Sequence, residues 1–251
     1  MKLCVELLSV AFETPKGRLP VLDRVSLEIG AGERVALVGE SGSGKTVLAL
    51  ALLGLLPRNA RVSGAARLGS FDLLDPQVAA RVRGRDIAIC WSDAERYFDP
   101  VRKVGRQIEE VCLLHGKCGA AEARRRALAL LERMGIEDSE RIYRSLPFQL
   151  SGGLNQRAMI AMSLAASPRV LIVDEPTRGL DGEARRRVIE ALASAGDVSM
   201  LLITHDLELA EALARRVYFM RQGLIVDSGS VPEALTAPQH PYAQALVRAA
   251  R

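Results

Sequence analysis

The stretch "RVALVGESGSGKT", residues 34–46, decides the fold. Its second part, residues 39–46, fits the pattern G-x-x-x-x-G-K-[ST] without a gap. The apolar run before this pattern indicates a strand buried on both faces, as in a parallel sheet. Glycines in such a loop let backbone N–H groups turn towards phosphate oxygens, and a helix that follows adds its positive end. The stretch therefore predicts a phosphate-binding loop on an α/β core.

Each residue of this loop has an expected role. We expect Lys45 to reach the β and γ phosphates of a nucleotide, and the Thr46 hydroxyl to bind Mg²⁺. The apolar residues that follow predict a buried helix over residues 45–56, ending before Pro57. The remaining loop residues are expected to contact phosphate: Gly39, Glu40, Ser41, Gly42, Ser43 and Gly44.

The hydrophobic pattern changes twice along the chain. Residues 3–29 alternate with a period of two, which predicts two or three strands joined by a turn-rich connector, "ETPKGRLP", at 13–20. Apolar residues then take helical spacing, and strands return from residue 169. This order predicts one α/β domain with an inserted helical lobe. The expected parts are a β subdomain and core over 1–85 and 168–251, and a helical lobe over 86–167.

Composition narrows the possible functions. The 251 residues carry 34 basic and 30 acidic side chains, and a net charge of +4 is too weak to indicate nucleic-acid binding. The longest uncharged apolar run, residues 47–56, falls short of the roughly 20 residues that cross a membrane. The N-terminus shows no signal-peptide pattern, so we expect a soluble cytoplasmic protein. The four cysteines form no CxxC pair and are expected to be reduced thiols.

Two further apolar runs end in polar residues. "RVLIVDEP", residues 169–176, places Asp174 at the end of a buried strand, where a carboxylate can hold Mg²⁺ through water, and Glu175 next to it can polarise an attacking water. "SMLLITHD", residues 199–206, ends a presumed neighbouring strand with His205, a candidate sensor of the γ-phosphate. The alternatives are that the carboxylates serve solubility and that the histidine is structural.

A second helix start lies in "QLSGGLNQR", residues 149–157. Ser151, Gly152 and Gly153 are expected to leave backbone N–H groups and a hydroxyl facing outward. Leu154 stands where the acid of a capping box would be, so no local anion is expected at this helix end. Because the element belongs to the helical lobe, we do not expect it to reach the Lys45 of its own chain. The pattern predicts two chains, head to tail, that share nucleotide between them.

Taken in order, these four motifs resemble the ATPase subunit of an ATP-binding cassette (ABC) transporter over essentially the whole chain. The resemblance implies a RecA-like P-loop NTPase core with an N-terminal antiparallel β subdomain and an inserted helical subdomain. It implies ATP and Mg²⁺ as ligands and a second ATPase subunit as partner. It also assigns Asp181, in "RGLD", to signalling between the two ATP sites, and makes Phe12 a candidate for stacking on adenine.

Three further segments resemble the importer ATPases for oligopeptides, dipeptides and nickel. They are "GLLPRNARVSG" at 54–64, "FDPVRKVGRQI" at 98–108 and "APQHPYAQALVRAA" at 237–250. This resemblance implies a non-identical second ATPase, two membrane permease subunits and, indirectly, an extracytoplasmic solute-binding protein. It implies a peripheral position at the cytoplasmic face of the inner membrane and no nucleic-acid partner. It leaves open whether nickel, peptide or another solute is transported.

The sequence departs from this family at one position. An alignment backwards from "FDPVRKVG" puts Ser92 where these ATPases carry a glutamine that contacts Mg²⁺ and the attacking water in a permease-facing loop. No glutamine occurs between residues 78 and 106, so a small shift in alignment does not supply one. We expect this loop to contact the permease but to couple less tightly. The alternative is that Asp93 or a water takes over the role.

Two other functional classes were weighed. One is a soluble ABC ATPase that acts on DNA or ribosomes, but such proteins usually carry long insertions or two cassettes, and neither is present in these residues. The other is a small-molecule kinase, which the LSGG element and the lack of an acceptor-binding lid disfavour. The prediction is therefore the ATP-hydrolysing subunit of an importer.

Overall fold

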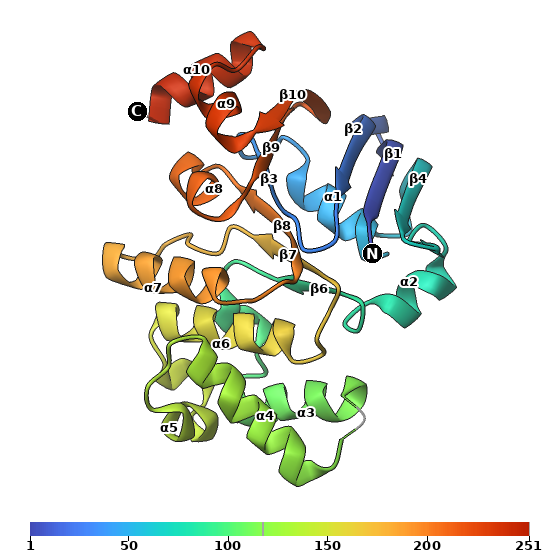
Figure 1. Ribbon diagram of the computed structural model, residues 1–251. Coiled ribbons are helices and arrows are strands. Elements are labelled where there is room, and N and C mark those ends of the chain that lie inside the picture. The colour runs from blue at the N-terminus through green and yellow to red at the C-terminus, as the bar shows by residue number, and fades with distance from the viewer. Residues whose placement is uncertain (117, 251) are drawn as a thin grey trace. The chain divides into compact units, whose positions relative to one another are not determined.

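The computed structural model describes residues 1–116 and 118–250, and the chain divides into two compact units. Unit 1 contains the described residues of Met1–Arg83 and Ser199–Arg251, and unit 2 contains Gly84–Val198. Figure 1 labels the elements of both units. The predicted limits of the helical lobe, 86–167, stay a prediction.

Unit 1 begins with an antiparallel sheet in the order β2-β1-β4-β5. Its strands are β1 (Leu3–Thr14), β2 (Gly17–Ile29), β4 (Ala60–Leu68) and β5 (Phe71–Asp72). The predicted connector over 13–20 is wrong, because β1 and β2 leave only residues 15 and 16 between them. Gly17 takes a φ of 111°, a left-handed conformation that lets the chain reverse in so short a turn.

The phosphate-loop strand β3 (Arg34–Val38) lies between β8 (Ser199–Thr204) and β9 (Arg216–Arg221) and runs parallel to both. Four of its five residues are buried, which explains the uninterrupted apolar run. Strand β10 (Leu224–Ser230) pairs antiparallel with β9. The helices of this part are α8 (Leu207–Leu213), α9 (Val231–Thr236) and α10 (Pro241–Ala250), all of which contribute to one buried cluster with β3 and β9.

Helix α1 (Lys45–Leu52) follows the loop and is shorter than predicted. It ends at Leu52 because Gly54 takes a φ of +63°, and the chain then closes on itself. The N–H of Gly54 donates to the Ala51 carbonyl, and that of Leu55 to the Leu50 carbonyl. This pair of bonds is a Schellman motif, which satisfies the last carbonyls of a helix without extending it. Unit 1 also contains α2 (Pro76–Val82), capped by the Asp75 carboxylate.

Unit 2 combines two parallel strands, β6 (Ile87–Cys90) and β7 (Val170–Asp174), with five α-helices among its described residues. Helix α6 is buried on nearly all sides and packs against β6, α4 and α7. The predicted fold class is confirmed: an α/β protein with an antiparallel sheet, parallel strands and a helix-rich segment. The helices are α3 (Val104–His115), α4 (Ala120–Arg133), α5 (Ser139–Arg144), α6 (Gly152–Leu164) and α7 (Gly182–Ala193).

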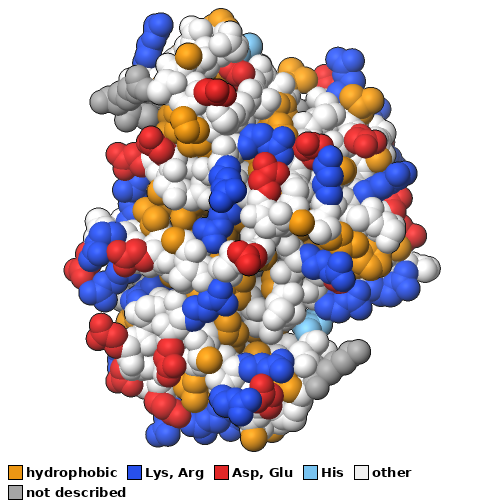
Figure 2. Space-filling model, in the orientation of Figure 1, with side chains coloured by type: hydrophobic (Ala, Val, Ile, Leu, Met, Phe, Trp, Pro, Cys, Tyr) orange, Lys and Arg blue, Asp and Glu red, His pale blue; other side chains and the backbone are white. Residues whose placement is uncertain are grey.

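Unit 2 contains two runs of three arginines, at 124–126 and 185–187, and both make ion pairs with acids of the same unit. Arg126 bonds to Glu122, and Arg187 bonds to Glu183 one helical turn away. On the face drawn in Figure 2, Lys and Arg side chains are interleaved with Asp and Glu. Such pairs on a helix surface are ordinary solvent-facing contacts. Across the described residues, every helix is too short or too polar to traverse a bilayer.

Candidate functional site

The phosphate loop folds around its own lysine. Lys45 is buried, and its Nζ donates to the carbonyl oxygens of Gly39 at 2.6 Å and Glu40 at 2.8 Å, with the Ser43 Oγ at 3.4 Å. Gly42 and Gly44 take φ values of +82° and +108°, which only glycine adopts at low cost. The loop thus holds an ammonium group within reach of any anion that enters it.

Neighbouring strands of unit 1 fix the position of the loop. A Cβ on Gly39 would lie 2.1 Å from the Met220 carbonyl oxygen, so only glycine fits against the end of β9. The N–H of Gly223, in the turn between β9 and β10, donates to the Ser43 carbonyl at 2.9 Å. Gly223 was not singled out from the sequence, although a Gln-Gly pair between two strands is a recognisable turn signal.

The start of α1 is suited to a phosphate group. Gly44 is its N-cap without a side-chain cap, and the first turn contains no acidic residue. The first N–H groups of the helix therefore face an uncapped end, and anions are stabilised there. Thr46 is exposed at this end. His205 follows β8, whose Thr204 lies opposite Val38 of β3, so His205 and the loop leave the sheet at the same edge.

In unit 2, the two candidate carboxylates end β7. Asp174 is the buried last residue of that strand, and Glu175 follows with a φ of 48°. A non-glycine residue in this left-handed region is strained, and such strain gathers at functional sites. Ser92 lies at the same sheet edge, because Cys90 pairs with Val173 in the parallel register of β6 and β7.

Helix α6 holds the loop that contains Ser92. The buried Gln156 donates from its Nε2 to the Trp91 carbonyl at 2.9 Å and contacts the Cys90 Sγ at 3.4 Å. Trp91 in turn stacks on Tyr97, with ring centroids 5.2 Å apart. Burial raises the pKa of the Cys90 thiol to about 12, so this contact involves a neutral thiol. Gln156 is not apparent from the sequence, because its partner lies 65 residues away.

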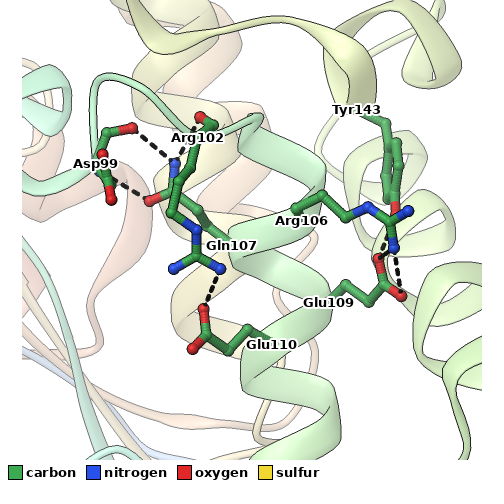
Figure 3. Close-up of polar contacts among 7 residues, drawn as sticks. All are labelled: Asp99, Arg102, Arg106, Gln107, Glu109, Glu110 and Tyr143. Atoms are coloured by element: carbon green, nitrogen blue, oxygen red, sulfur yellow. Dashed lines mark hydrogen bonds and ion pairs between the residues drawn. The ribbon is translucent and has the colours of Figure 1, made fainter.

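Two side chains of α3 hold the segment after this loop (Figure 3): Gln107 bonds to its backbone, and Glu110 pairs with Arg102 at 2.6 Å. Gln107 accepts from the Asp99 N–H at 2.8 Å and donates to the carbonyls of Asp99 at 3.1 Å and Arg102 at 3.0 Å. The oxygen and the nitrogen of this buried amide therefore both form hydrogen bonds with the backbone of the preceding turn. The turn at 99–102 keeps a defined shape as a result.

A second polar cluster stabilises the same helix from within unit 2 (Figure 3). The buried Glu109 carboxylate accepts hydrogen bonds from Arg106 and from the Tyr143 hydroxyl. Burial, and then this bond to Glu109, raise the pKa of Tyr143 to about 12. Gly105 packs against the Tyr143 ring, since a Cβ there would lie 2.0 Å from the ring Cδ2. The cluster locks α3 to α5.

The serine–glycine helix end forms as predicted at the start of α6. Ser151 is its N-cap, and no acidic residue stands in the first turn. The Ser151 hydroxyl accepts a long bond, 3.4 Å, from the Leu154 N–H, so it caps its own helix as well as facing outward. Ser151 and Gly152 are exposed, whereas Gly153 is buried, and a Cβ there would lie 2.8 Å from the Ala184 Cβ.

Ser151, Gly153 and Asp181 meet at one cavity of about 380 Å³ in unit 2. Asp181 caps α7, with its Oδ1 accepting from the Ala184 N–H at 2.8 Å. The buried Arg157 also lines this cavity, and it donates to the Gly135 carbonyl at 2.6 Å and to the Gly153 carbonyl at 3.4 Å. It was not identified from the sequence. Its burial lowers the pKa of the guanidinium, which therefore depends on these carbonyls.

Phe12 belongs to none of these motifs and lies on a different strand. It is half-buried on β1, opposite Leu19 of β2 and Ala60 of β4. Its stacking on adenine stays a prediction.

Known proteins resemble this chain at the level of sequence. A family described as ABC transporter matches residues 22–178. The chain is 42% identical, over 98% of its length, to the peptidoglycan transport ATP-binding protein YejF of Agrobacterium fabrum, but it spans only 46% of that relative. It is 40% identical to the dipeptide transport ATP-binding protein DppD of Haemophilus influenzae, covering 97% of this chain and 76% of the relative. Identity to the oligopeptide transport ATP-binding protein AppD of Bacillus subtilis is 36%, over 96% and 75%.

Solved structures share the fold. The dimeric ATP-binding cassette MJ0796, bound to ADP and Pi, superposes with a TM-score of 0.80 at 23% identity, covering 91% of this chain and 98% of that one. The structure of cbiO1 from Clostridium perfringens, part of the transporter complex cbiONQ, gives a TM-score of 0.76 at 25% identity, over 94% and 90%.

Proposed function

Since this chain belongs to the ABC transporter family as an ATP-binding, ATP-hydrolysing subunit, we propose that it powers an importer of peptides. The observation that carries the proposal is the pair of phosphate-suited helix ends, at α1 and α6, on a chain whose relatives are named for dipeptide and oligopeptide transport. Those names favour peptide over nickel as the solute. ATP turnover then drives a change in partner subunits that bind the solute.

We infer that ATP lies between two ATPase subunits. Lys45 and the loop N–H groups hold the phosphates in one subunit, and Ser151 with Gly152 and Gly153 of the other closes the site. The dimeric cassette described above supports this arrangement through its shared fold. Thr46 and Asp174 would hold Mg²⁺, which neutralises charge on the phosphates when bound. The exposed hydroxyl of Thr46 and the buried carboxylate of Asp174 are oxygen donors of the type that this ion prefers.

The remaining site residues take part in hydrolysis and in signalling between the two ATP sites. Glu175 orients the attacking water and accepts its proton, a role supported by its position directly after β7 and by its left-handed backbone. His205 senses the γ-phosphate from the edge shared with the loop. Asp181, at the same cavity as Ser151, relays the state of one site to the other.

The proposed partners are a non-identical ATPase subunit, two membrane permeases and, through them, a solute-binding protein. The segment after Ser92 exposes Tyr97 by 50% and Val101 by 82%, a suitable surface for a permease loop. The chain would sit peripherally on the cytoplasmic face of the membrane. Interleaved charges give no support to a nucleic-acid partner. Stimulation of ATP turnover by DNA or ribosomes would favour the soluble alternative.

Glu175→Gln tests the proposal. Without a base for the water, the variant should bind ATP but hydrolyse it at less than about 1% of the normal rate, consistent with general-base losses. It should therefore accumulate as an ATP-bound dimer with its partner ATPase, measured by size-exclusion chromatography with light scattering. Glu6→Gln, on the exposed face of β1, is the control and should behave as wild type. Normal turnover by Glu175→Gln would remove the assigned role.

A further inference from the structure

The C-terminal helix reaches the phosphate loop through one side chain. The hydroxyl of Tyr242, in the first turn of α10, accepts a hydrogen bond from the Glu40 N–H at 3.0 Å. Tyr242 is only 7% exposed, and the guanidinium of Arg221 lies over its ring at 5.1 Å. Arg221 ends β9, next to the Met220 carbonyl against which Gly39 packs. The tyrosine therefore stands beside the loop in a closed environment.

This bond acts on the same peptide unit that Lys45 holds. The N–H of Glu40 and the carbonyl of Gly39 belong to one planar peptide group. Tyr242 binds its N–H side, and the Lys45 Nζ binds its carbonyl side at 2.6 Å. When Lys45 turns to a phosphate it gives up the carbonyl, and the tyrosine hydroxyl then remains to keep this peptide from rotating.

The tyrosine is itself held by a short chain of contacts. The carboxylate of Asp227, on β10, accepts the N–H groups of Gln239 at 2.7 Å and His240 at 2.8 Å. The His240 Nδ1 then accepts from the Tyr242 N–H at 3.1 Å. These bonds fix the start of α10, and Ala243 and Val247 anchor the helix in the core of unit 1. The hydroxyl position is thus set by the fold and not by the loop.

We propose that Tyr242 is a positioning residue for ATP binding, which orients the Gly39–Glu40 peptide so that the loop is already shaped for phosphate when Lys45 moves. The proposal rests on the assignment of residues 39–46 as the ATP-binding loop. Tyr242 touches no reacting atom and acts through the loop backbone. Its contribution is preorganisation, which lowers the cost of ordering on binding.

Tyr242→Phe tests this role, and the chain offers a matched control. Tyr218 is also 7% exposed, also lies beneath an arginine, and its hydroxyl also accepts a backbone N–H, but that of Glu28 on β2. We expect Tyr242→Phe to raise the Kd for a fluorescent ATP analogue, and for ADP, by about three- to tenfold, the usual range for one neutral hydrogen bond. Tyr218→Phe should change either Kd by less than about twofold.

Three readouts separate positioning from a loss of stability. Without nucleotide, the two phenylalanine variants should have the same Tm. In the assembled transporter, Tyr242→Phe should raise the KM for ATP with little change in kcat. Asp227→Asn, which weakens the anchor of α10, should shift KM in the same direction by less. Equal Kd values for the two phenylalanine variants, with binding abolished by Lys45→Ala, would overturn this inference alone. Unchanged binding by Lys45→Ala would instead overturn the proposed loop.

Discussion

The two helix ends that the sequence singles out differ in what surrounds them. The start of α1 is held by its own unit: Gly44 and Lys45 are buried, Gly39 packs against Met220, and Tyr242 is bonded to Glu40. The start of α6 is open, with Ser151 and Gly152 exposed and only the serine's own hydroxyl as a cap. Support for α6 comes from behind, where Arg157 and Ala184 contact Gly153.

This contrast suggests different roles for the two helix ends: the first binds the nucleotide, and the second completes the site of a partner subunit. A loop held in shape by its own unit can bind an anion with groups of a single chain, because its lysine is already in place. An outward-facing helix end offers donors to whatever approaches, and on its own it is a weak site. The comparison therefore predicts that damage to the first end strongly weakens ATP affinity, whereas damage to the second end affects only the assembled pair.

The largest expected difference comes from removing one side chain at each end. Lys45→Ala should weaken ATP binding to the isolated chain by roughly 100-fold, because a charge-assisted contact to phosphate is lost. Ser151→Ala should leave that affinity within about twofold, yet lower ATP turnover in the assembled transporter by about tenfold or more. Calorimetry on the isolated chain and phosphate release from the complex measure the two effects. If the isolated Ser151→Ala chain lost its affinity for ATP, the two helix ends would not have the separate roles proposed here.

An intermediate effect is expected from Gly153→Ala. The new methyl group would meet the Ala184 Cβ at 2.8 Å, so the start of α6 must shift. We expect turnover in the assembled transporter to fall by about fivefold, while the isolated chain keeps its affinity for ATP. Gly182→Ala is the control, since a Cβ there meets nothing within 4 Å. Adding Ala184→Gly should restore turnover, and a double variant as slow as the single one would contradict the steric explanation.

The smallest effect is expected at Ser92, which leaves the same edge of the β6–β7 pair as Glu175. Ser92→Gln supplies the longer side chain that the family resemblance implies here, so we expect ATP turnover and transport in the complex to rise by about two- to threefold. Gln156 holds the preceding carbonyl in both forms, which keeps the loop in place. Measured rates of hydrolysis and uptake that do not change would indicate that Asp93 or a water already fills the role.

The sequence predicts those parts of the site whose chemistry is local. The phosphate loop, the ends of β7 and β8 and the start of α6 each fit within a few residues, so their spacing predicts their structure. Tyr242 lies 202 residues from its partner, and Gln156 lies 65 from its own, so no local pattern reveals either contact. The end of α1 was misplaced by four residues, because apolar periodicity continues past Leu52 while Gly54 closes the helix.

Helix α6 has one more consequence for how the molecule works. Ser151, the N-cap of α6, would meet the partner's nucleotide, and Gln156, five positions later, is bonded to the carbonyl before Ser92. At about 1.5 Å per residue this is roughly 7.5 Å of stiff backbone. A helical segment this short is stiff, so we expect a displacement of the helix start to be transmitted to the Trp91 carbonyl. The coupling between the ATP site and the Ser92 loop would then depend on the rigidity of the first one and a half turns of α6.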